Sequence, residues 1–331
     1  MIQADLFLHA AYTIFVPMKT PVDIWAELGA RLSSFGQDAA SREVIARACQ
    51  KNDWFEPEEI VDAVRSIREE FLSRDKIERW LACYERPATL PSRTVLVVMA
   101  GNIPLVGFFD LLCVLASGHA CRVKPSSKDT VLIGYVVDLL RAIDPAIPLR
   151  MAEQGERPDA VIATGSDNAN RYFRMLFGGI PSLLRGSRQS VAVLSGRETA
   201  AELSGLEEDI FAYSGLGCRN VSLLFLPRGY MPELRCTALN EKYRRNYLRE
   251  RALLRMRRMP FVDLDGAVLC EDRSFPAALS RIHYTFYDSL ADVEAWLAAH
   301  DDRLQCVVSQ CVRHSRRVAF GRAQHPGLTD Y

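Results

Sequence analysis

The chain has 331 residues, of which 49% are hydrophobic and 25% are charged, a profile typical of a soluble globular protein with about two domains. Lysine plus arginine and aspartate plus glutamate both number 41, so the formal net charge is zero, which argues against a general nucleic-acid binder. The nine cysteines are scattered, without a C-x-x-C pair or an H-E-x-x-H segment. This pattern argues against a disulfide framework and a structural zinc site, and it favours the cytoplasm.

Two stretches of the chain are apolar enough to be compared with a signal peptide or a membrane span. Residues 1–17 lack a basic segment and include Asp5, so we do not interpret them as a signal peptide. Residues 96–120 are more apolar, but Asn102, Pro104 and three glycines interrupt them. A buried strand, turn and helix therefore explain residues 96–120 better than a membrane span does.

Helical patterns dominate the first 90 residues. Apolar residues recur at helical spacing, and proline or acidic residues begin several of the runs. The predicted helices span 21–35, 41–50 with Ser41 as the N-cap, 57–71 and 76–84. We interpret residues 1–90 as a helical N-terminal region that packs against the rest of the chain.

From residue 93 onward, β-branched strands alternate with apolar helices. The predicted strands span 94–100, 120–123, 159–163, 180–184 and 190–194, and the predicted helices span 105–117, 128–143 and 167–177. Strands that alternate with helices indicate a parallel, doubly wound sheet. We therefore expect residues 91–195 to form a Rossmann-like, nucleotide-binding domain.

Three polar turns follow strands of this sheet, at Asn102, Lys124 and Gly165. Ligands of such sheets lie beyond the carboxyl ends of the strands, where all three turns fall. No G-x-G-x-x-G segment occurs. Lys124 could nevertheless hold ribose or phosphate oxygens, and the helix that Gly165 and Ser166 open favours an anion. The alternative is that these residues are a solvated lysine, a helix cap and a turn asparagine.

Residues 196–331 form the second predicted domain, which is also α/β. Its predicted elements are a helix at 198–213, strands at 221–226, 282–286 and 305–309, a strand and turn at 263–272, a helix at 288–299 and a basic helical run at 232–259. The basic run includes Lys242 and seven arginines between residues 244 and 258. It is either a solvated helix face or a docking surface for a phosphate-rich ligand or an acidic partner.

The segment FAYSGLGCRNVS, at residues 211–222, carries the candidate nucleophile. Cys218 lies there between a helical run and an apolar strand, with Gly215 and Gly217 beside it. A thiol at such a junction could act as a nucleophile, because small neighbours let a carbonyl approach and backbone N–H groups could bind an oxyanion. Taken alone, Cys218 could equally be a small apolar packing residue.

Four segments in a fixed order resemble the aldehyde dehydrogenase superfamily, and in detail its acyl-CoA reductase branch, which includes the fatty-acyl reductase of bacterial luminescence systems. They are AGNIP at 100–104, KPSS at 124–127, ATGSD at 163–167 and FAYSGLGCRNVS. The segments RIHYTFYD at 281–288 and FGRAQHPGLTDY at 320–331 also resemble that branch. The resemblance implies an aldehyde-dehydrogenase-like α/β fold, in which a Rossmann-type doubly wound sheet is joined to a second α/β catalytic domain.

The resemblance also implies roles for individual residues. Cys218 matches the family nucleophile, and Asn102 matches the asparagine whose amide holds the oxyanion together with the Cys218 backbone N–H.

In the same way, Lys124 and its neighbour Ser126 match the turn that binds the adenosine ribose or its 2′-phosphate. Gly165 and Ser166 match the turn that meets the cofactor pyrophosphate. The implied cofactor is NADPH or NADH.

One position departs from the aldehyde-oxidising members of the superfamily. Those members carry a glutamate shortly before a Gly-Gly-Lys stretch, and this glutamate activates water for thioester hydrolysis. An ungapped match places Leu184 at that position. Without this base, an acyl group on Cys218 should be hydrolysed slowly, which favours reduction or transfer of the group.

The resemblance therefore implies an acyl-CoA reductase that converts an acyl-CoA, in particular a fatty acyl-CoA, to the aldehyde through a thioester on Cys218. The alternatives are an acyltransferase or thioesterase that works without hydride transfer, and a non-catalytic acyl-binding subunit of a fatty-acid-handling complex. We expect a cytoplasmic homo-oligomer, without a membrane span or a metal, that works with acyl-transferring or acyl-activating protein partners.

Overall fold

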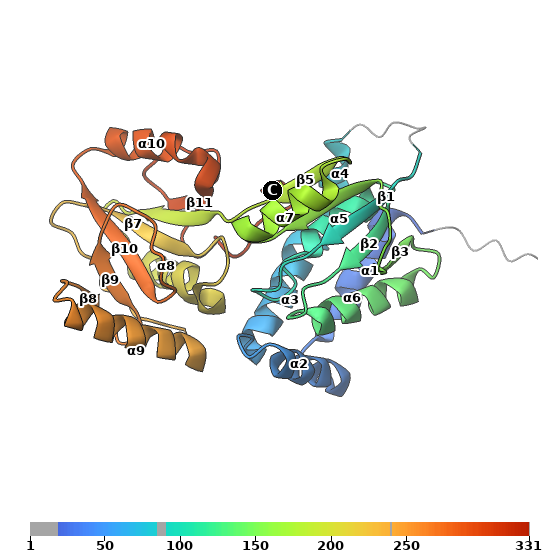
Figure 1. The fold of residues 1–331 in the computed structure, drawn as a ribbon, viewed down its shortest axis with the longest axis horizontal. Helices are drawn as coiled ribbons and strands as arrows, with labels where there is room; N and C mark the ends of the chain where they lie inside the picture. The colour runs from blue at the N-terminus through green and yellow to red at the C-terminus, as the bar shows by residue number, and fades with distance from the viewer. Residues whose placement is uncertain (1–18, 85–90, 239, 331) are drawn as a thin grey trace, which may run out of the picture.

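The computed structural model describes residues 19–84, 91–238 and 240–330. The stretch 1–17, which we do not interpret as a signal peptide from its sequence, lies outside the described residues. Two lobes make up the described chain, each built on one sheet (Figure 1). The first lobe is residues 19–185 and the second lobe is residues 189–318.

The helices alternate with strands after the N-terminal region, as the sequence predicts. The α-helices are α1 (Pro21–Arg31), α2 (Ala39–Lys51), α3 (Pro57–Phe71), α4 (Arg74–Ala82), α5 (Phe108–Ala116), α6 (Thr130–Ile143), α7 (Asp167–Phe177), α8 (Ala200–Phe211), α9 (Glu241–Met256) and α10 (Leu290–Ala299). Short 3₁₀ helices are η1 (Leu32–Ser34), η2 (Ala212–Gly215) and η3 (Asp301–Arg303).

The first sheet is parallel and has the order β3-β2-β1-β4-β5. Its strands are β1 (Thr94–Val98), β2 (Ala120–Lys124), β3 (Leu149–Met151), β4 (Ala160–Thr164) and β5 (Ser182–Arg185). The strand order reverses between β1 and β4, which is the switch point where doubly wound sheets bind their ligands.

The second sheet has the order β12-β11-β6-β7-β10-β9-β8 and is parallel except for the β8–β9 pair. Its strands are β6 (Gln189–Val193), β7 (Val221–Pro227), β8 (Val262–Asp263), β9 (Val268–Glu271), β10 (Arg281–Tyr287), β11 (Leu304–Ser309) and β12 (Arg317–Val318). The sheets therefore change between β5 and β6, whereas the predicted domain boundary follows residue 195, after β6. The division into domains itself remains a prediction.

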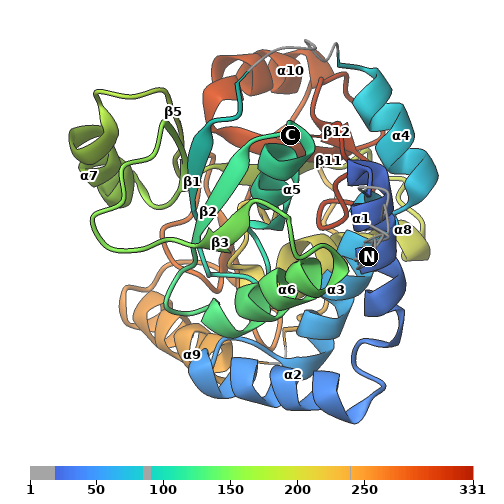
Figure 2. The same cartoon turned by 90° about the vertical axis from the view of Figure 1, so that its right-hand side faces the viewer.

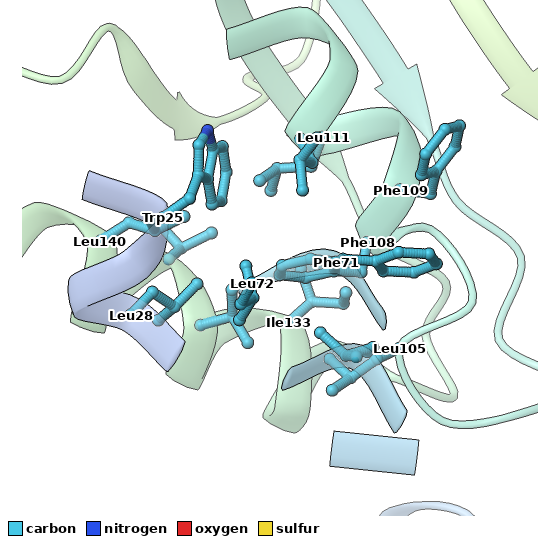
Figure 3. Close-up of a cluster of buried hydrophobic side chains, with 14 of the residues drawn as sticks. Trp25, Leu28, Phe71, Leu72, Leu105, Phe108, Phe109, Leu111, Ile133 and Leu140 are labelled. Atoms are coloured by element: carbon cyan, nitrogen blue, oxygen red, sulfur yellow. The ribbon is translucent and has the colours of Figure 1, made fainter. Parts of the chain in front are cut away.

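The N-terminal helices pack against the first sheet through a buried aromatic cluster (Figure 3). Trp25 of α1 meets Phe108 of α5 edge-on, with ring centroids 6.0 Å apart, and Phe71 of α3 stacks on Phe108 at 6.3 Å. Such pairs add about 0.5–1.5 kcal/mol each beyond the burial of their apolar area. Figure 2 shows α1, α3 and α4 to the right of the strands β1, β2 and β3, and α2 below them.

Three predicted helix starts are wrong for identifiable local reasons. Asp38, not Ser41, caps α2, because the Asp38 carboxylate accepts the Ser41 N–H at 2.8 Å. Helix α5 begins at Phe108 instead of residue 105, because Leu105 has a left-handed φ of 55° that a right-handed helix excludes. Helix α9 begins only at Glu241, after its N-cap Asn240, instead of residue 232.

Residues 320–330 run from the second lobe back to the first. Ala323 lies in a core cluster of the second lobe and Leu328 lies in the main core of the first. Arg322 pairs with Glu70 of α3 at 2.7 Å. This segment therefore links the two lobes through apolar packing and an ion pair. Among the described helices, none combines the length and the apolarity that crossing a bilayer requires.

Candidate active site

Cys218 lies in the segment between α8 and β7, which includes η2 and which we call the nucleophile loop (residues 212–220). Three successive residues at the start of this loop have left-handed backbones: Tyr213 with φ 53°, Ser214 with φ 54° and Gly215 with φ 66°. Residues other than glycine adopt a left-handed backbone only at a cost in free energy, and residues strained in this way cluster at functional sites. The turn brings Cys218 to the surface, where it is exposed.

Asn220 holds the nucleophile loop from within. Its side chain is buried, its Oδ1 accepts the Gly217 N–H at 2.8 Å, and its Nδ2 donates to the Ala212 carbonyl at 2.8 Å. Nδ2 also reaches the carbonyls of Asp209 and Ile210 in the last turn of α8, at 3.3 and 3.1 Å. One amide thus joins the end of α8 to the residue that precedes the cysteine.

Ser190 fixes the other end of the loop. Its fully buried hydroxyl donates to the Cys218 carbonyl at 2.9 Å and accepts the Cys306 N–H at 3.2 Å. Because β6 carries Ser190 and β11 carries Cys306, two neighbouring strands hold the peptide group of the cysteine in place.

Asn102 connects the first lobe to the nucleophile loop. Its Nδ2 donates to the Leu216 carbonyl at 2.6 Å, across 114 positions of sequence. An amide NH₂ group has two hydrogens, so one remains for a second acceptor. The residue before it is also fixed, because Asn52 at the end of α2 donates to the Gly101 carbonyl at 3.3 Å. The structure therefore brings Asn102 to the nucleophile loop, two residues before Cys218, and the joint action of the two residues stays a prediction.

Helix α3 reaches the same loop through Glu59. The backbone N–H groups of Tyr213 and Ser214 donate to the Glu59 carboxylate, which favours its charged form. Burial has the larger effect and raises the pKa of Glu59 to about 7. The N-terminal helices are thus more than a packing layer, since one of them contacts the loop that carries the cysteine.

Burial and the charges of three arginines act on the Cys218 thiol in opposite directions. Surrounding protein limits the hydration of the thiolate and raises the pKa of Cys218. The positive charge of Arg219 lowers that pKa in part, and Arg188 and Arg185 act in the same direction. Arg219 is buried and donates to the Asp330 carbonyl at 3.1 Å. The sequence alone did not indicate what would stabilise the thiolate.

The polar turn after β2 packs directly on the turn after β1. A Cβ on Gly101 would lie 2.6 Å from the Cβ of Ser126, so only glycine allows this approach. Lys124 ends β2 beside Val98 of β1 and is exposed. Among the described residues, no ion pair engages the Lys124 ammonium group. Lys124 and Ser126 thus lie at the carboxyl edge of the sheet, next to the switch point.

Gly165 and Ser166 follow β4 on the other side of β1. Ser166 caps α7, since its Oγ accepts the Ala169 N–H at 3.3 Å. A Cβ on Gly165 would lie 3.0 Å from the Cβ of Ala169, so the turn sits close to the helix. Strands two positions apart are about 10 Å apart, which separates this turn from Lys124. An exposed lysine, a helix N-terminus and a switch point fit a nucleotide cofactor.

Sequence reasoning missed Ser190, Asn220 and Glu59. Asn220 belongs to the segment FAYSGLGCRNVS, so the asparagine two residues after the cysteine was a signal that was available. Ser190 and Glu59 gave no signal, because tertiary packing brings them to the loop. Leu184, which the resemblance places at the position of the hydrolytic base, packs with the apolar core of the first sheet.

Comparison with known proteins decides the family. The model of the family described as Acyl-CoA reductase (LuxC) matches residues 33–236, well over half of the chain. The chain belongs to this family. The match includes the turns at Asn102, Lys124 and Gly165 and the nucleophile loop, and it confirms the resemblance inferred from those segments.

A curated member of similar sequence is long-chain acyl-protein thioester reductase 2 of Photobacterium leiognathi. It is 26% identical over 176 residues, which cover 46% of this chain and 36% of that protein. The match thus spans about a third of the length of this relative.

Solved structures of similar fold are aldehyde dehydrogenases. An NAD-dependent benzaldehyde dehydrogenase from Corynebacterium glutamicum is 13% identical with a TM-score of 0.61, and the match covers 88% of this chain and 76% of that one. An acetylating aldehyde dehydrogenase from Geobacillus thermoglucosidasius is 10% identical with a TM-score of 0.61, over 93% and 85% of the two chains. These likenesses confirm the aldehyde-dehydrogenase-like fold.

Proposed function

We propose that this protein is an acyl-CoA reductase that converts an acyl-CoA, in particular a fatty acyl-CoA, to the aldehyde with NADPH or NADH. One observation carries the proposal. The Asn102 side chain, on the turn at the switch point of the first sheet, donates to Leu216 in the nucleophile loop at 2.6 Å. The edge of the sheet at which doubly wound folds bind nucleotides therefore lies beside the loop that carries the candidate nucleophile.

The first step in this proposal is a thiol exchange. The Cys218 sulfur attacks the carbonyl carbon of the acyl-CoA, a new C–S bond forms, and the C–S bond to CoA breaks. The proton of the Cys218 thiol ends on the CoA thiol. Because one thioester replaces another, the exchange needs no large driving force. Burial raises the pKa of the Cys218 thiol, and the positive charges of Arg219 and Arg188 offset part of this rise in favour of the attacking thiolate.

The oxyanion that forms at the carbonyl needs donors. The second hydrogen of the Asn102 amide and the Cys218 backbone N–H are the groups that we assign to it, and one such donor is typically worth about 3 kcal/mol. Ser190 holds the Cys218 carbonyl, on the other side of the Cys218 Cα from the N–H that supplies the second donor.

A nicotinamide cofactor, when bound, supplies the hydride that reduces the acyl carbon. We assign Lys124 and Ser126 to its ribose or 2′-phosphate, and Gly165 and Ser166 to its pyrophosphate. Collapse of the resulting tetrahedral anion then breaks the C–S bond and releases the aldehyde. Cys218 is left as a thiolate, which takes a proton from water.

Hydrolysis of the acyl group is disfavoured in this site. Leu184 is half-buried in apolar packing and carries no group that could activate water. The charged side chains that most affect the Cys218 thiol are arginines. Both observations support reduction or transfer of the acyl group over hydrolysis.

The test is mass spectrometry of Cys218 after mixing with hexadecanoyl-CoA, followed by addition of NADPH or NADH. We expect an acyl adduct on Cys218 and aldehyde only after the nicotinamide is added, and Cys218→Ala should lose both. An adduct without nicotinamide binding would favour the acyltransferase alternative. Absence of any adduct would favour a non-catalytic acyl-binding subunit.

We also propose a homo-oligomer in the cytoplasm. Strand β5 is an edge of the first sheet, and Leu183 on it and Tyr172, Met175 and Leu176 on α7 are exposed apolar side chains. Several large apolar side chains exposed on an edge strand and a neighbouring helix support a subunit contact there. All nine cysteines are free thiols, which supports a reducing compartment.

A further inference from the structure

The strongest charge asymmetry of the chain lies on α9 and has no part in the candidate active site. Residues 242–258 contain eight of the 41 basic residues and one of the 41 acidic residues, Glu250. Their formal charge is therefore +7, while the rest of the chain carries −7. Glu250 is buried and pairs with Arg281 at 2.6 Å and with Arg249 at 3.6 Å. Part of the surface charge is offset, because Glu241 lies 3.3 Å from Arg245 and Asp263 lies 3.6 Å from Arg251 and 3.9 Å from Arg255. The positive excess remains, and Arg244, Arg257 and Arg258 form no ion pair among the described residues.

The basic side chains form two rows on the exposed face of α9. Tyr243, Tyr247 and Leu254 are buried and fix which face packs on the lobe. Residues four and seven positions apart share a face of a helix.

One row on the opposite face contains Arg244, Leu248 and Arg255, and the other contains Arg245, Arg249 and Met256. The helix is about 24 Å long, so the rows form an extended surface. Figure 1 shows α9 at the lower edge of the second lobe, with the strands β8 and β9 above it.

Apolar side chains are interleaved with these arginines. Met256 is 81% exposed, and Leu248 and Met259 are also exposed. A helix that lies in a membrane interface separates its apolar side chains onto one face, which α9 does not do. Arginine and methionine are instead the residues enriched in protein interfaces. The composition and arrangement of α9 therefore favour an acidic protein surface over a lipid surface.

Helix α9 is connected to the active site at its N-terminal end. Asn240, its N-cap, donates to the Asp53 carbonyl at 2.9 Å and to the Glu56 carboxylate at 2.7 Å. Lys242 pairs with Asp53. Glu59, less than one helical turn after Glu56, contacts the nucleophile loop. A protein docked on α9 would therefore lie next to the elements that hold Cys218.

We propose that the exposed face of α9 docks a small acidic carrier protein that presents an acyl thioester on a long flexible arm. This inference rests on the proposed function and names a second class of acyl donor for it. The transfer is the same exchange as with acyl-CoA. The new C–S bond forms at Cys218, the C–S bond of the carrier breaks, and the carrier thiol takes the proton of the Cys218 thiol.

The test measures binding apart from chemistry. The full chain carrying Cys218→Ala is titrated with a bacterial acyl carrier protein loaded with a hexadecanoyl group. The second variant adds Arg244→Glu and Arg255→Glu, and a milder form uses Arg244→Gln and Arg255→Gln. The matched control adds Arg313→Glu and Arg317→Glu, which remove two exposed arginines beyond β11 that form no ion pair among the described residues.

We expect the α9 charge reversal to weaken carrier binding at least about tenfold, which corresponds to about 1.4 kcal/mol. The milder pair should weaken binding less, and the Arg313 and Arg317 control should bind like the parent. Hexadecanoyl-CoA should still acylate Cys218 in a chain that carries only the α9 changes. That result would show that the α9 changes weaken docking of the carrier and leave the chemistry at Cys218 intact.

Three results would overturn the docking proposal. The first is that the carrier protein does not bind at all. The second is that the α9 reversal and the Arg313 and Arg317 reversal weaken carrier binding equally. The third is that vesicles of equimolar phosphatidylglycerol and phosphatidylcholine bind to α9 in place of the carrier. Failure of the proposed function looks different, because the carrier would then bind through α9 while neither donor acylates Cys218.

Discussion

Replacing Ser190 by alanine separates the positioning of the nucleophile from the stability of the fold. The change removes the bond to the Cys218 carbonyl at 2.9 Å and the bond from the Cys306 N–H at 3.2 Å. A buried hydrogen bond contributes about 1 kcal/mol net, so Ser190→Ala should lower the free energy of unfolding by about 2 kcal/mol. It should also let the Cys218 peptide group move.

Ser309 supplies a matched control on the same sheet. Its buried hydroxyl donates to the Val193 carbonyl at 2.8 Å and accepts the Cys311 N–H at 3.1 Å. The two serines therefore lose the same kinds of bond, but Ser309 lies at the carboxyl end of β11, away from Cys218. Ser309→Ala should cost about the same 2 kcal/mol.

The assay compares three quantities in both variants. They are the melting temperature, the kcat and KM of aldehyde formation, and the rate at which iodoacetamide alkylates Cys218, followed on its peptide by mass spectrometry. A displacement of about 1 Å of a reacting group can slow a reaction about 10²-fold, so we expect kcat to fall at least about tenfold in Ser190→Ala, with little change in KM. Equal losses of kcat in the two variants would refute the positioning role of Ser190.

Three further predictions concern the first lobe. Asn102→Ala should lower kcat by about 10²–10³-fold, because an oxyanion donor is lost. Gly101→Ala should lower the free energy of unfolding by about 1–3 kcal/mol and weaken nicotinamide binding in a fluorescence titration, because the new Cβ would overlap Ser126. Burial raises the pKa of Asp129 to about 7, so the folded chain favours the protonated carboxyl. The stability gained from this protonation is fully present below about pH 4 and is lost as the pH rises through about 7. Asp129→Asn keeps an acceptor for the Leu105 N–H, and its melting temperature should fall less than the parent's between about pH 5 and pH 8.

Each of these predictions has a result that contradicts it. An unchanged kcat in Asn102→Ala would remove the oxyanion role. Unaltered stability in Gly101→Ala would mean that the two turns separate freely. Equal pH dependence of melting in Asp129→Asn and the parent would show that the carboxyl is ionised in the folded chain at all these pH values.

The alternation of strands and helices was predictable, because β-branched runs bounded by turns mark the strands and apolar runs of ten or more residues mark the helices. The limits of α3 and α7 coincide with the prediction for the same reason, since each has a clear first turn. Strands β3 and β12 were missed, because three and two residues carry no periodic signal. Strand order was not predictable, because pairing depends on contacts between distant residues.

For the site, the sequence predicted the residues that lie in short motifs and missed those that tertiary packing supplies. Asn102 and Cys218 were recognisable together only through the order of the motifs. Ser190 reaches Cys218 across 28 positions and Cys306 across 116, through pairing of β6 with β7 and β11. No local pattern could indicate such contacts, and the same holds for Glu59 on α3.

The segment 320–330 has a consequence for the order of folding. Arg322 and Glu70 lie 252 positions apart, and such contacts close very long loops, so they form late. During synthesis, the helices of the first lobe emerge long before Leu328, which completes their core. Arg219, beside the nucleophile, is held by Asp330 from the same segment. The environment of Cys218 is therefore completed only when residues 320–330 are in place, and a chain synthesised only to residue 319 would carry the cysteine without the contact that holds Arg219.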